Sequence, residues 1–186
     1  MVTVRSIENL ELLGGDVALD FANTLEATHE GDPIKDHLRS PDDLVTFARR
    51  TGALPDRAPA GDLDAARSLR AAIHAVFAAV ATGEPPPLAP LETLLAAHAS
   101  AIAAGRLTPG ESYTWEWERP DLRWPVAVAA VDLLRSPDRL ARVKRCAQCS
   151  WLFLDRSRNG SRRWCMMGEC GAQVKMRRYR AARRGG

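Results

Sequence analysis

Apolar residues recur every three or four positions over several parts of the chain, which is the spacing of amphipathic helices. The clearest case is residues 62–81, where Leu69, Ile73 and Phe77 belong to one such series before GEPPP interrupts it. Residues 90–104 continue in the same way and are followed by Gly105. The pattern therefore predicts two consecutive helices in the middle of the chain.

The segment 40–52 carries helix signals at both of its ends. Ser40 can cap the first turn, Pro41 fits the first helical position, and Gly52 is a typical stop residue. Aspartates come first and arginines last, so the charges complement the helix dipole. We expect a complete short helix here.

Three further segments fix the expected fold class. The spacing predicts helices over residues 19–29 and 123–140, the latter with a second capped turn that opens at Ser136. Residues 111–120 instead alternate polar and apolar positions, which predicts a half-buried strand. Its tryptophans are expected in the core with Trp124. A mainly α domain with a minor β element accounts for all of these signals.

Charge divides the chain where its composition changes. Residues 139–186 hold fourteen Arg and Lys against two acidic residues, a net charge of +12, whereas the remainder carries −9. All four cysteines also lie in the basic part. Because 186 residues suffice for one core and a small appended module, we predict a helical domain at 1–141 and a module at 142–186.

The cysteines of this module have the spacing of a metal site. They are arranged as C-x2-C, fifteen residues, then C-x4-C, which brings four sulfurs together in a closed tetrahedral Zn²⁺ site. Two disulfides or a redox-sensing thiol pair are the alternatives. The predicted zinc ligands are Cys146, Cys149, Cys165 and Cys170.

The expected location of the protein bears on the choice between metal and disulfide. The chain has no apolar run of about 18 residues and does not begin with a charged stretch followed by an apolar one. We therefore expect a cytoplasmic protein without a membrane partner. In a reducing cytoplasm, metal binding is favoured over disulfides.

The module is expected to be a β-hairpin followed by a helix, as in treble-clef or ribbon-like zinc modules. Residues 151–155 alternate as a hairpin strand would, and Asn159 with Gly160 supplies a turn. Gly171 precedes a helix that reaches about Arg184. A module of about 45 residues buries too little surface to fold alone, so bound metal would contribute roughly 10–16 kcal/mol.

The final helix predicts a cationic face. An apolar stripe of Ala172, Met176 and Tyr179 runs beside this face and is expected to pack on the zinc lobe. Arginines in this arrangement are suited to phosphates and guanine edges, although a solvated face in an arginine-rich proteome is the alternative. The candidate nucleic-acid residues are Arg156, Arg158, Arg162, Arg163, Gln173, Lys175, Arg177, Arg178, Arg180 and Arg184.

These motifs resemble a known family over essentially the whole chain. The segment with C-x2-C, Phe153-x-Asp155, RRWC, C-G and K-x-RRYR resembles the CGNR zinc finger of bacterial transcription regulators. LDFANTL and DLVTFARRTGAL are similar to the ABATE domain that accompanies it. The resemblance implies a DNA-binding zinc module behind a helical domain that senses a signal. Here CGNR is CGAQ, so Ala172 and Gln173 replace asparagine and arginine.

Other polar residues have two interpretations each. Asp20 and Asn23 are tertiary caps, which we favour, or the floor of a ligand pocket. His29 and His37, with nearby aspartates, could form a weak second metal or ligand site, whereas scattered His74 and His98 are expected to be satisfied or surface side chains. We find no nucleophile and base pair and no phosphate-binding glycine loop, so no enzymatic activity is expected.

The sequence thus predicts a zinc-dependent, DNA-binding transcription regulator. Its helical domain would form a C₂ homodimer, bind a small-molecule effector, or both. Two alternatives remain: a zinc module that binds RNA or an acidic protein, and a thiol redox sensor that ejects zinc on oxidation.

Overall fold

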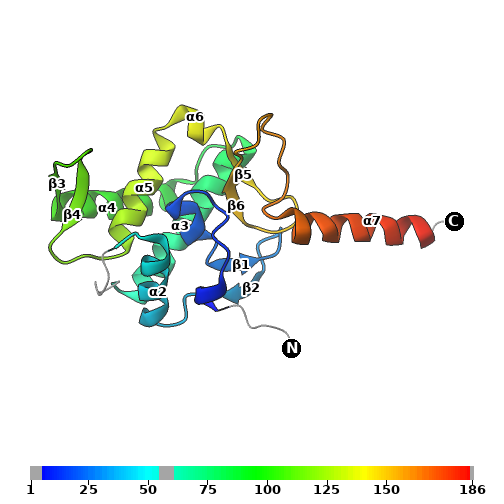
Figure 1. The fold of residues 1–186 in the computed structure, drawn as a ribbon, viewed down its shortest axis with the longest axis horizontal. Helices are drawn as coiled ribbons and strands as arrows, with labels where there is room; N and C mark the ends of the chain where they lie inside the picture. The colour runs from blue at the N-terminus through cyan, green and yellow to red at the C-terminus, as the bar shows by residue number, and fades with distance from the viewer. Residues whose placement is uncertain (1–5, 55–60, 185–186) are drawn as a thin grey trace.

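The computed structural model describes residues 6–54 and 61–184. Helices form a body from which the last helix projects (Figure 1). The helices are η1 (Ile7–Asn9), α1 (Val17–Ala22), α2 (Pro41–Thr51), α3 (Leu63–Thr82), α4 (Leu88–Ala104), α5 (Arg123–Leu134), α6 (Pro137–Leu140), the π-helix η2 (Met167–Gly171) and α7 (Ala172–Arg184).

Short antiparallel hairpins complete the fold, and each is a separate two-stranded sheet. In the first hairpin Leu25 pairs with Asp36, and in the last Val143 pairs with Leu154. The pairs are β1 (Leu25–Ala27) with β2 (Pro33–Asp36), β3 (Gly105–Thr108) with β4 (Thr114–Trp117), and β5 (Val143–Arg145) with β6 (Leu152–Leu154). The predicted class, mainly α with minor β elements and a terminal hairpin–helix module, is confirmed.

The helices predicted over 40–52, 62–81 and 90–104 are confirmed as α2, α3 and α4, and the first two are capped. In α2 the Ser40 backbone N–H donates to the Asp43 carboxylate at 2.8 Å, and Gly52 closes the helix at φ 66°. α3 begins after Asp62, whose carboxylate accepts a hydrogen bond from the Ala65 N–H at 2.7 Å. These local signals fix helix ends because they satisfy backbone groups that the helix itself leaves unpaired.

The helix predicted over 19–29 is wrong in its second half. α1 ends at Ala22, and residues 25–27 form strand β1 instead. The Thr24 hydroxyl donates to the Phe21 carbonyl at 2.7 Å and closes the helix, while the Asn23 side chain is bonded to a distant strand. Tertiary contacts therefore end the helix where the apolar spacing alone would continue it.

The predicted tryptophan strand is present, but its side chains lie outside the core. Trp115 and Trp117 on β4 are half-buried and stack with ring centroids 6.3 Å apart. Trp117 also lies 6.2 Å from Trp124 and donates its indole N–H to the Ala101 carbonyl. The expected burial of the three rings is wrong because leucine, phenylalanine and alanine side chains already fill the space between the helices.

A single hydrophobic core runs through the whole body. Phe21 of α1 meets Phe47 of α2 edge to face at 5.5 Å, and α3 and α5 pack around them. Leu152 and Phe153 of β6 are fully buried in the same cluster. The boundary at 141/142 stays a prediction, but the core crosses that position without a break.

The terminal hairpin differs from the expected one in its turn. β5 and β6 are joined through the first cysteine pair, whereas Asn159 and Gly160 lie in the next loop, where Gly160 has φ 58°. All three β6 residues are buried, so the expected alternation is absent. The reason is that the body covers both faces of this strand.

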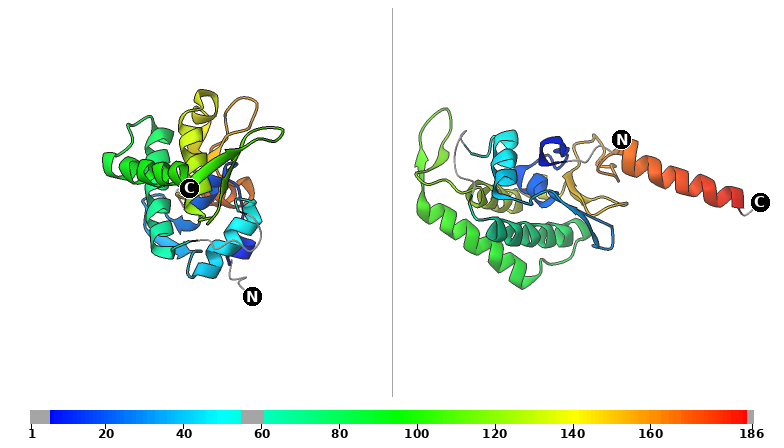
Figure 2. Two further views of the ribbon diagram at one scale, coloured as in Figure 1. Left: turned by 90° about the vertical axis from the view of Figure 1, so that its left-hand side faces the viewer. Right: turned by 90° about the horizontal axis from the view of Figure 1, so that it is seen from below.

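Helix α7 leaves the body and extends away from it (Figure 2). Met176 and Tyr179 are 49% and 55% exposed, so the predicted packing of this apolar stripe on the zinc lobe is wrong. Buried Cys170 and Gly171 fix where the helix begins, and its remaining residues lie progressively farther from the lobe. Within the described ranges, no helix has the length and hydropathy needed to cross a bilayer.

Candidate metal centre and cationic surface

The four cysteine sulfurs come together at one point of the fold. The Sγ atoms all lie within 4.8 Å of one another, with Cys149 at 3.7 Å from Cys165 and at 3.8 Å from Cys170. The Sγ atoms of Cys165 and Cys170 are 3.6 Å apart. Four sulfurs about 2.3 Å from a central Zn²⁺ would be roughly 3.8 Å apart. The cluster therefore has the dimensions of a tetrahedral thiolate site.

Two backbone turns position these sulfurs. Cys146 and Cys149 lie in the turn between β5 and β6, which the Cys146 N–H closes by donating to the Trp151 carbonyl at 2.8 Å. Cys165 and Cys170 lie on either side of the start of η2. The Ala147 N–H donates to the Arg163 carbonyl at 3.0 Å and joins the two turns directly.

The electrostatics of the cluster favour a bound cation. Hydrogen bonds from Cys149 hold the pKa of the Cys146 thiol well below its usual range. A shared hydrogen bond with Cys146 raises the pKa of the Cys149 thiol to about 12, and burial raises that of Cys170. Four thiols this close cannot all ionise unless a cation compensates them. A divalent ion supplies that compensation and suits a thiolate donor set.

Asp155 organises the loop between the two cysteine pairs. Its carboxylate is buried and accepts hydrogen bonds from Lys144 Nζ at 2.8 Å, from the Ser157 hydroxyl at 2.6 Å and from the Arg162 N–H at 2.9 Å. Burial raises the pKa of this carboxyl, but hydrogen bonds from Lys144 and Ser157 outweigh that effect and hold it well below its usual range. Asp155 is therefore an anion that holds the loop in place.

Arg162 holds the metal lobe rather than facing solvent. Its guanidinium lies 4.4 Å from the Phe153 ring centroid and donates to the Trp164 and Cys165 carbonyls. The sequence pattern predicts this residue in a nucleic-acid surface. Its donors instead fix the backbone next to a cysteine of the cluster.

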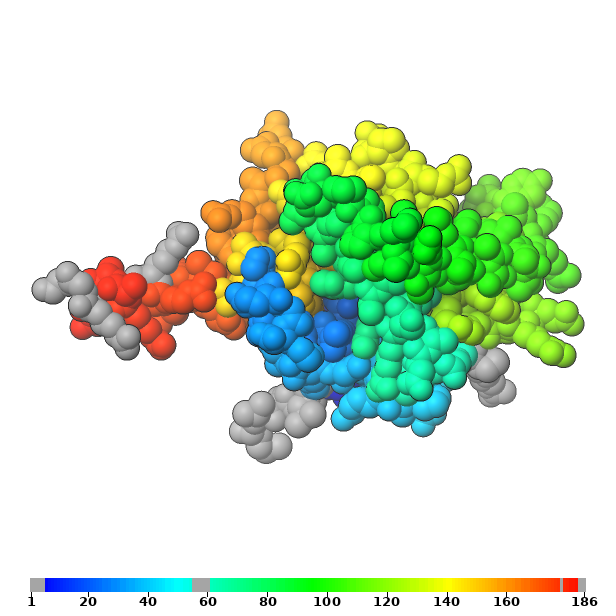
Figure 3. All heavy atoms as spheres, turned by 180° about the vertical axis from the view of Figure 1, so that it is seen from behind, coloured from blue at the N-terminus to red at the C-terminus, as the bar shows by residue number. Residues whose placement is uncertain are grey.

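The helical domain clamps the first cysteine pair. Thr28 forms a β-bridge with Cys149, and His29 Nδ1 lies 3.1 Å from the Cys146 carbonyl oxygen. His74 Nε2 lies 2.9 Å from the Ser150 carbonyl oxygen, and burial lowers the pKa of His74. These contacts hold the metal lobe against α3 and β1, and Figure 3 shows the lobe beside the first hairpin from behind.

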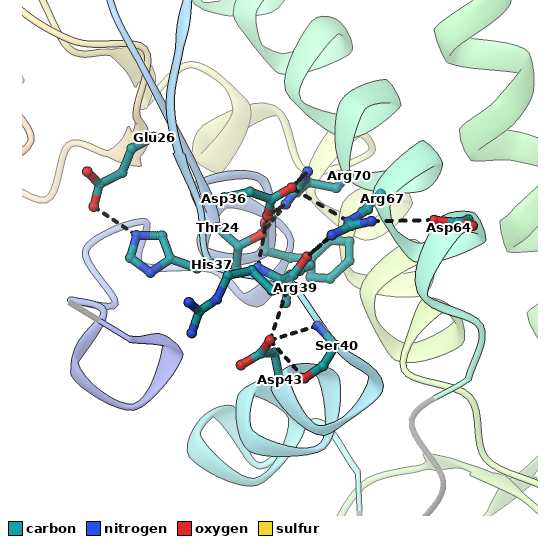
Figure 4. Close-up of polar contacts among 12 residues, drawn as sticks. Thr24, Glu26, Asp36, His37, Arg39, Ser40, Asp43, Asp64, Arg67 and Arg70 are labelled. Atoms are coloured by element: carbon teal, nitrogen blue, oxygen red, sulfur yellow. Dashed lines mark hydrogen bonds and ion pairs between the residues drawn. The ribbon is translucent and has the colours of Figure 1, made fainter. Parts of the chain in front are cut away.

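The structure does not assemble the second metal site considered for the histidine pair. The His29 side chain contacts the backbone carbonyl of Cys146, whereas the buried His37 ring contacts the Glu26 carboxylate at 2.8 Å (Figure 4). Among the residues placed by the structure, the four cysteines are the only group of His, Cys, Asp or Glu with suitable metal-ligating geometry.

Asp20 and Asn23 bond backbone groups of neighbouring segments. The Asn23 carboxamide accepts from the Leu152 N–H and donates to the Leu152 carbonyl, both at 2.8 Å, and so extends the edge of β6. Asp20 accepts from the Gly14 N–H at 2.7 Å, and burial raises its pKa to about 6. Both have the arrangement of tertiary caps rather than of a pocket floor.

The other candidate nucleic-acid residues whose side chains the structure describes lie on two exposed surfaces, helix α7 and the loop after β6. Gln173, Lys175, Arg177 and Arg180 are exposed on α7, and Arg177 reaches Gln148 of the first cysteine turn at 3.0 Å. The side chains of Arg178 and Arg184, which also belong to α7, lie outside the described part of the chain. Arg156, Arg158 and Arg163 are exposed on the loop after β6.

Sequence reasoning missed two members of the loop surface. Arg139 of α6 and Arg142 before β5 line an open groove together with Arg156 and Arg158. Arg139 also pairs with Asp16 at 2.6 Å, and Arg142 donates to the Ser157 carbonyl at 3.1 Å. Their position just before the first cysteine was the signal available in the sequence.

Two family models match this chain, one over the helical domain and one over the metal lobe. Residues 15–137 match the model of the ABATE family, described as "Putative stress-induced transcription regulator". Residues 142–183 match the CGNR zinc finger. A comparison with curated proteins finds no match. Since the first model covers more than half of the chain, the protein belongs to the ABATE family and carries a CGNR zinc finger at its C-terminal end.

Proposed function

We propose that this protein is a zinc-dependent DNA-binding transcription regulator with no catalytic activity of its own. The observation that carries the proposal is helix α7. It projects from the body beside the cysteine cluster, and its thirteen residues include six Lys and Arg and no acidic residue. A helix with its side chains is about 10–12 Å across and so fits the DNA major groove, which is about 12 Å wide, and the positive charge of α7 complements the phosphates.

The role of Zn²⁺ is to fix the position of this helix. Cys146, Cys149, Cys165 and Cys170 would hold the ion, and Cys170 lies in η2, which leads directly into α7. Bound Zn²⁺ would cross-link the four thiolates, and no coordination position would remain open for catalysis. The cationic groove at Arg142 and Arg158 would contact phosphates while α7 faces the bases.

The test is fluorescence anisotropy of the zinc-loaded protein on duplex genomic fragments over a series of salt concentrations. About five phosphate contacts predict a log–log salt slope near −4.5. Replacing Arg177 and Arg180 together by glutamine should make the slope shallower by about 2. Arg106→Gln is the matched control, because Arg106 is 82% exposed on β3, in the helical domain rather than the zinc finger. Affinity that is independent of salt would contradict the proposal.

Competition assays separate DNA from the other polyanions that this surface could bind. Duplex DNA, RNA and an acidic polypeptide are added to the same labelled complex at equal charge concentration. We expect duplex DNA to compete best. Stronger competition by RNA or by the polypeptide would replace transcription regulation with an interaction-module function.

A further inference from the structure

A cavity of about 170 Å³ lies between the helical domain and the metal lobe. Its walls come from α1, β1, α3 and the residue after the first cysteine pair. Most of the lining is apolar and includes Leu25 and Ala71, while Arg70, His74 and Ser150 contribute the polar atoms. The space thus joins two parts of the chain that the family models treat separately.

Two buried polar atoms of this wall lack a hydrogen-bond partner among the described residues: Nε of Arg70 and Oγ of Ser150. Arg70 is 5% exposed and Ser150 is 1% exposed. Leaving such atoms unbonded costs about 1–3 kcal/mol each. Both can donate a hydrogen bond, so they call for an acceptor in the cavity.

The rest of Arg70 is committed elsewhere, which fixes the direction of the free N–H. Its two terminal nitrogens bond the Asp36 carboxylate at 2.5 and 2.8 Å (Figure 4). Arg67 reaches the same carboxylate at 3.6 Å. Arg67 also pairs with Asp64 at 3.5 Å, so the terminal nitrogens of both guanidinium groups are satisfied and only the Arg70 Nε–H is left without an acceptor in the described part of the chain.

His74 and Ser150 are likewise fixed by the backbone. His74 Nε2 bonds the Ser150 carbonyl, and the Ser150 N–H donates to the Ala27 carbonyl at 3.2 Å. Arg145 and Arg70 both act electrostatically on His74, which burial keeps in its neutral form by lowering its pKa. The Nε–H of Arg70 and the Ser150 hydroxyl, both unpartnered within the described ranges, can donate, so the cavity favours a ligand with acceptor oxygens over a cation.

We propose that this cavity binds a small aliphatic carboxylate, whose oxygens accept from Arg70 Nε and the Ser150 hydroxyl while its chain lies against Leu25 and Ala71. The volume suits a ligand with a short chain, and the apolar wall suits its methylene groups. Because Ser150 follows Cys149, this deepens the proposed regulator function by placing an effector next to the metal site.

The experiment uses zinc-loaded, ¹⁵N-labelled protein and three probes of matched size: butyrate, butyramide and butylammonium. The Arg70 Nε–H signal and the Ser150 amide are followed by ¹H–¹⁵N correlation spectra. Butyrate should shift both signals saturably, with half-saturation at or below about 10 mM. Butyramide should bind more weakly and butylammonium should not bind. Preference for the cation would overturn the assigned ligand class.

Two variants locate the binding. Ala71 is exposed at the rim, so Ala71→Leu fills the cavity without disturbing the core and should abolish the butyrate shifts. Ala99→Leu, at an exposed position of α4, is the control and should leave them unchanged. Ser150→Ala should weaken butyrate about fivefold, as expected for one lost hydrogen bond.

Each negative outcome has a distinct meaning. Equal butyrate shifts in Ala71→Leu would overturn the site and leave a cavity that water fills. The absence of shifts in the unmodified protein at about 50 mM butyrate, well above the expected half-saturation, would do the same. Butyrate binding without DNA binding would overturn the proposed regulator function but support the cavity. DNA binding without butyrate binding would do the reverse.

Discussion

Asn23 connects the two halves of the chain through a single side chain. Its carboxamide bonds both backbone groups of Leu152, and all of these atoms are buried. Removal of this side chain leaves a buried N–H and a buried carbonyl without their partner. Buried polar groups in that state are among the most destabilising changes that a single substitution produces.

We therefore expect Asn23→Ala to lower the free energy of unfolding by about 2–4 kcal/mol. Urea denaturation of the zinc-loaded protein measures this change. Thr93→Ala is the control, because it removes only an exposed hydroxyl that bonds Ala89 within α4, and it should change stability by less than about 0.5 kcal/mol. Equal effects of the two substitutions would show that Asn23 does not couple the halves.

Asp20 makes stability depend on pH in a direction opposite to most carboxylates. Burial raises its pKa from 3.8 to about 6, so the folded state binds this proton more tightly than the unfolded chain does. Stability from this group is therefore greatest below pH 4 and is lost as pH rises through about 6. Above that pH the buried charge opposes folding.

The expected result for Asp20→Asn is a gain of about 1–3 kcal/mol at pH 8 and little change at pH 4. An amide oxygen can still accept from Gly14, so the cap is retained. The measurement is urea denaturation at both pH values, with exposed Asp64→Asn for comparison. If Asp20→Asn is destabilising by the same amount at both, the side chain is not held in its neutral form.

At the scale of elements, α7 differs from every helix of the body. Its residues after the first turn pack against little, whereas α4 packs against α3 and α5. A thirteen-residue helix is marginal on its own in water. Stability of α7 should therefore affect what it binds but not whether the body folds.

One substitution made in two helices tests this difference. Glycine is less favourable than alanine in a helix by about 1 kcal/mol. Ala181→Gly should therefore weaken DNA binding up to about fivefold and leave the melting temperature unchanged. Ala99→Gly in α4 should lower the melting temperature and leave DNA affinity intact. Both alanines are exposed, so neither change opens a cavity. The reverse pattern would mean that α7 is part of the folded core.

Elements with local signals could be predicted from the sequence, and those set by distant contacts could not. The caps at Ser40 and Gly52 define α2, and the four cysteine positions predict the cluster. The end of α1 depends on Leu152, more than a hundred residues away, and the orientation of α7 depends on where Cys170 is held. Arg162 likewise turns inward because its guanidinium donates to the backbone carbonyl of Trp164, a contact that no sequence pattern indicates.

For the whole molecule, the continuous core makes the metal lobe part of the folding unit. Leu152, Phe153 and Cys146 belong to the same hydrophobic cluster as Phe21 and Ile73. Loss of the ion should therefore destabilise the helical domain as well as the finger. The expected homodimer stays a prediction, which size-exclusion chromatography with light scattering would test.

Removal of zinc by a chelator under reducing conditions should lower the melting temperature of the entire chain in a single transition, because metal binding contributes to folding. Far-ultraviolet circular dichroism follows the helical domain, and the backbone amide signals of β5 and β6 in ¹H–¹⁵N spectra follow the metal lobe. The two signals should shift together. If the helical signal melts unchanged after chelation, the two halves fold independently.

The most direct test of the central claim is the metal content of protein purified under reducing conditions, measured by elemental analysis. The account predicts one zinc per chain, and its loss in Cys165→Ser, which removes one corner of the sulfur cluster. Protein that contains no stoichiometric metal, or that retains full zinc in Cys165→Ser, would contradict it.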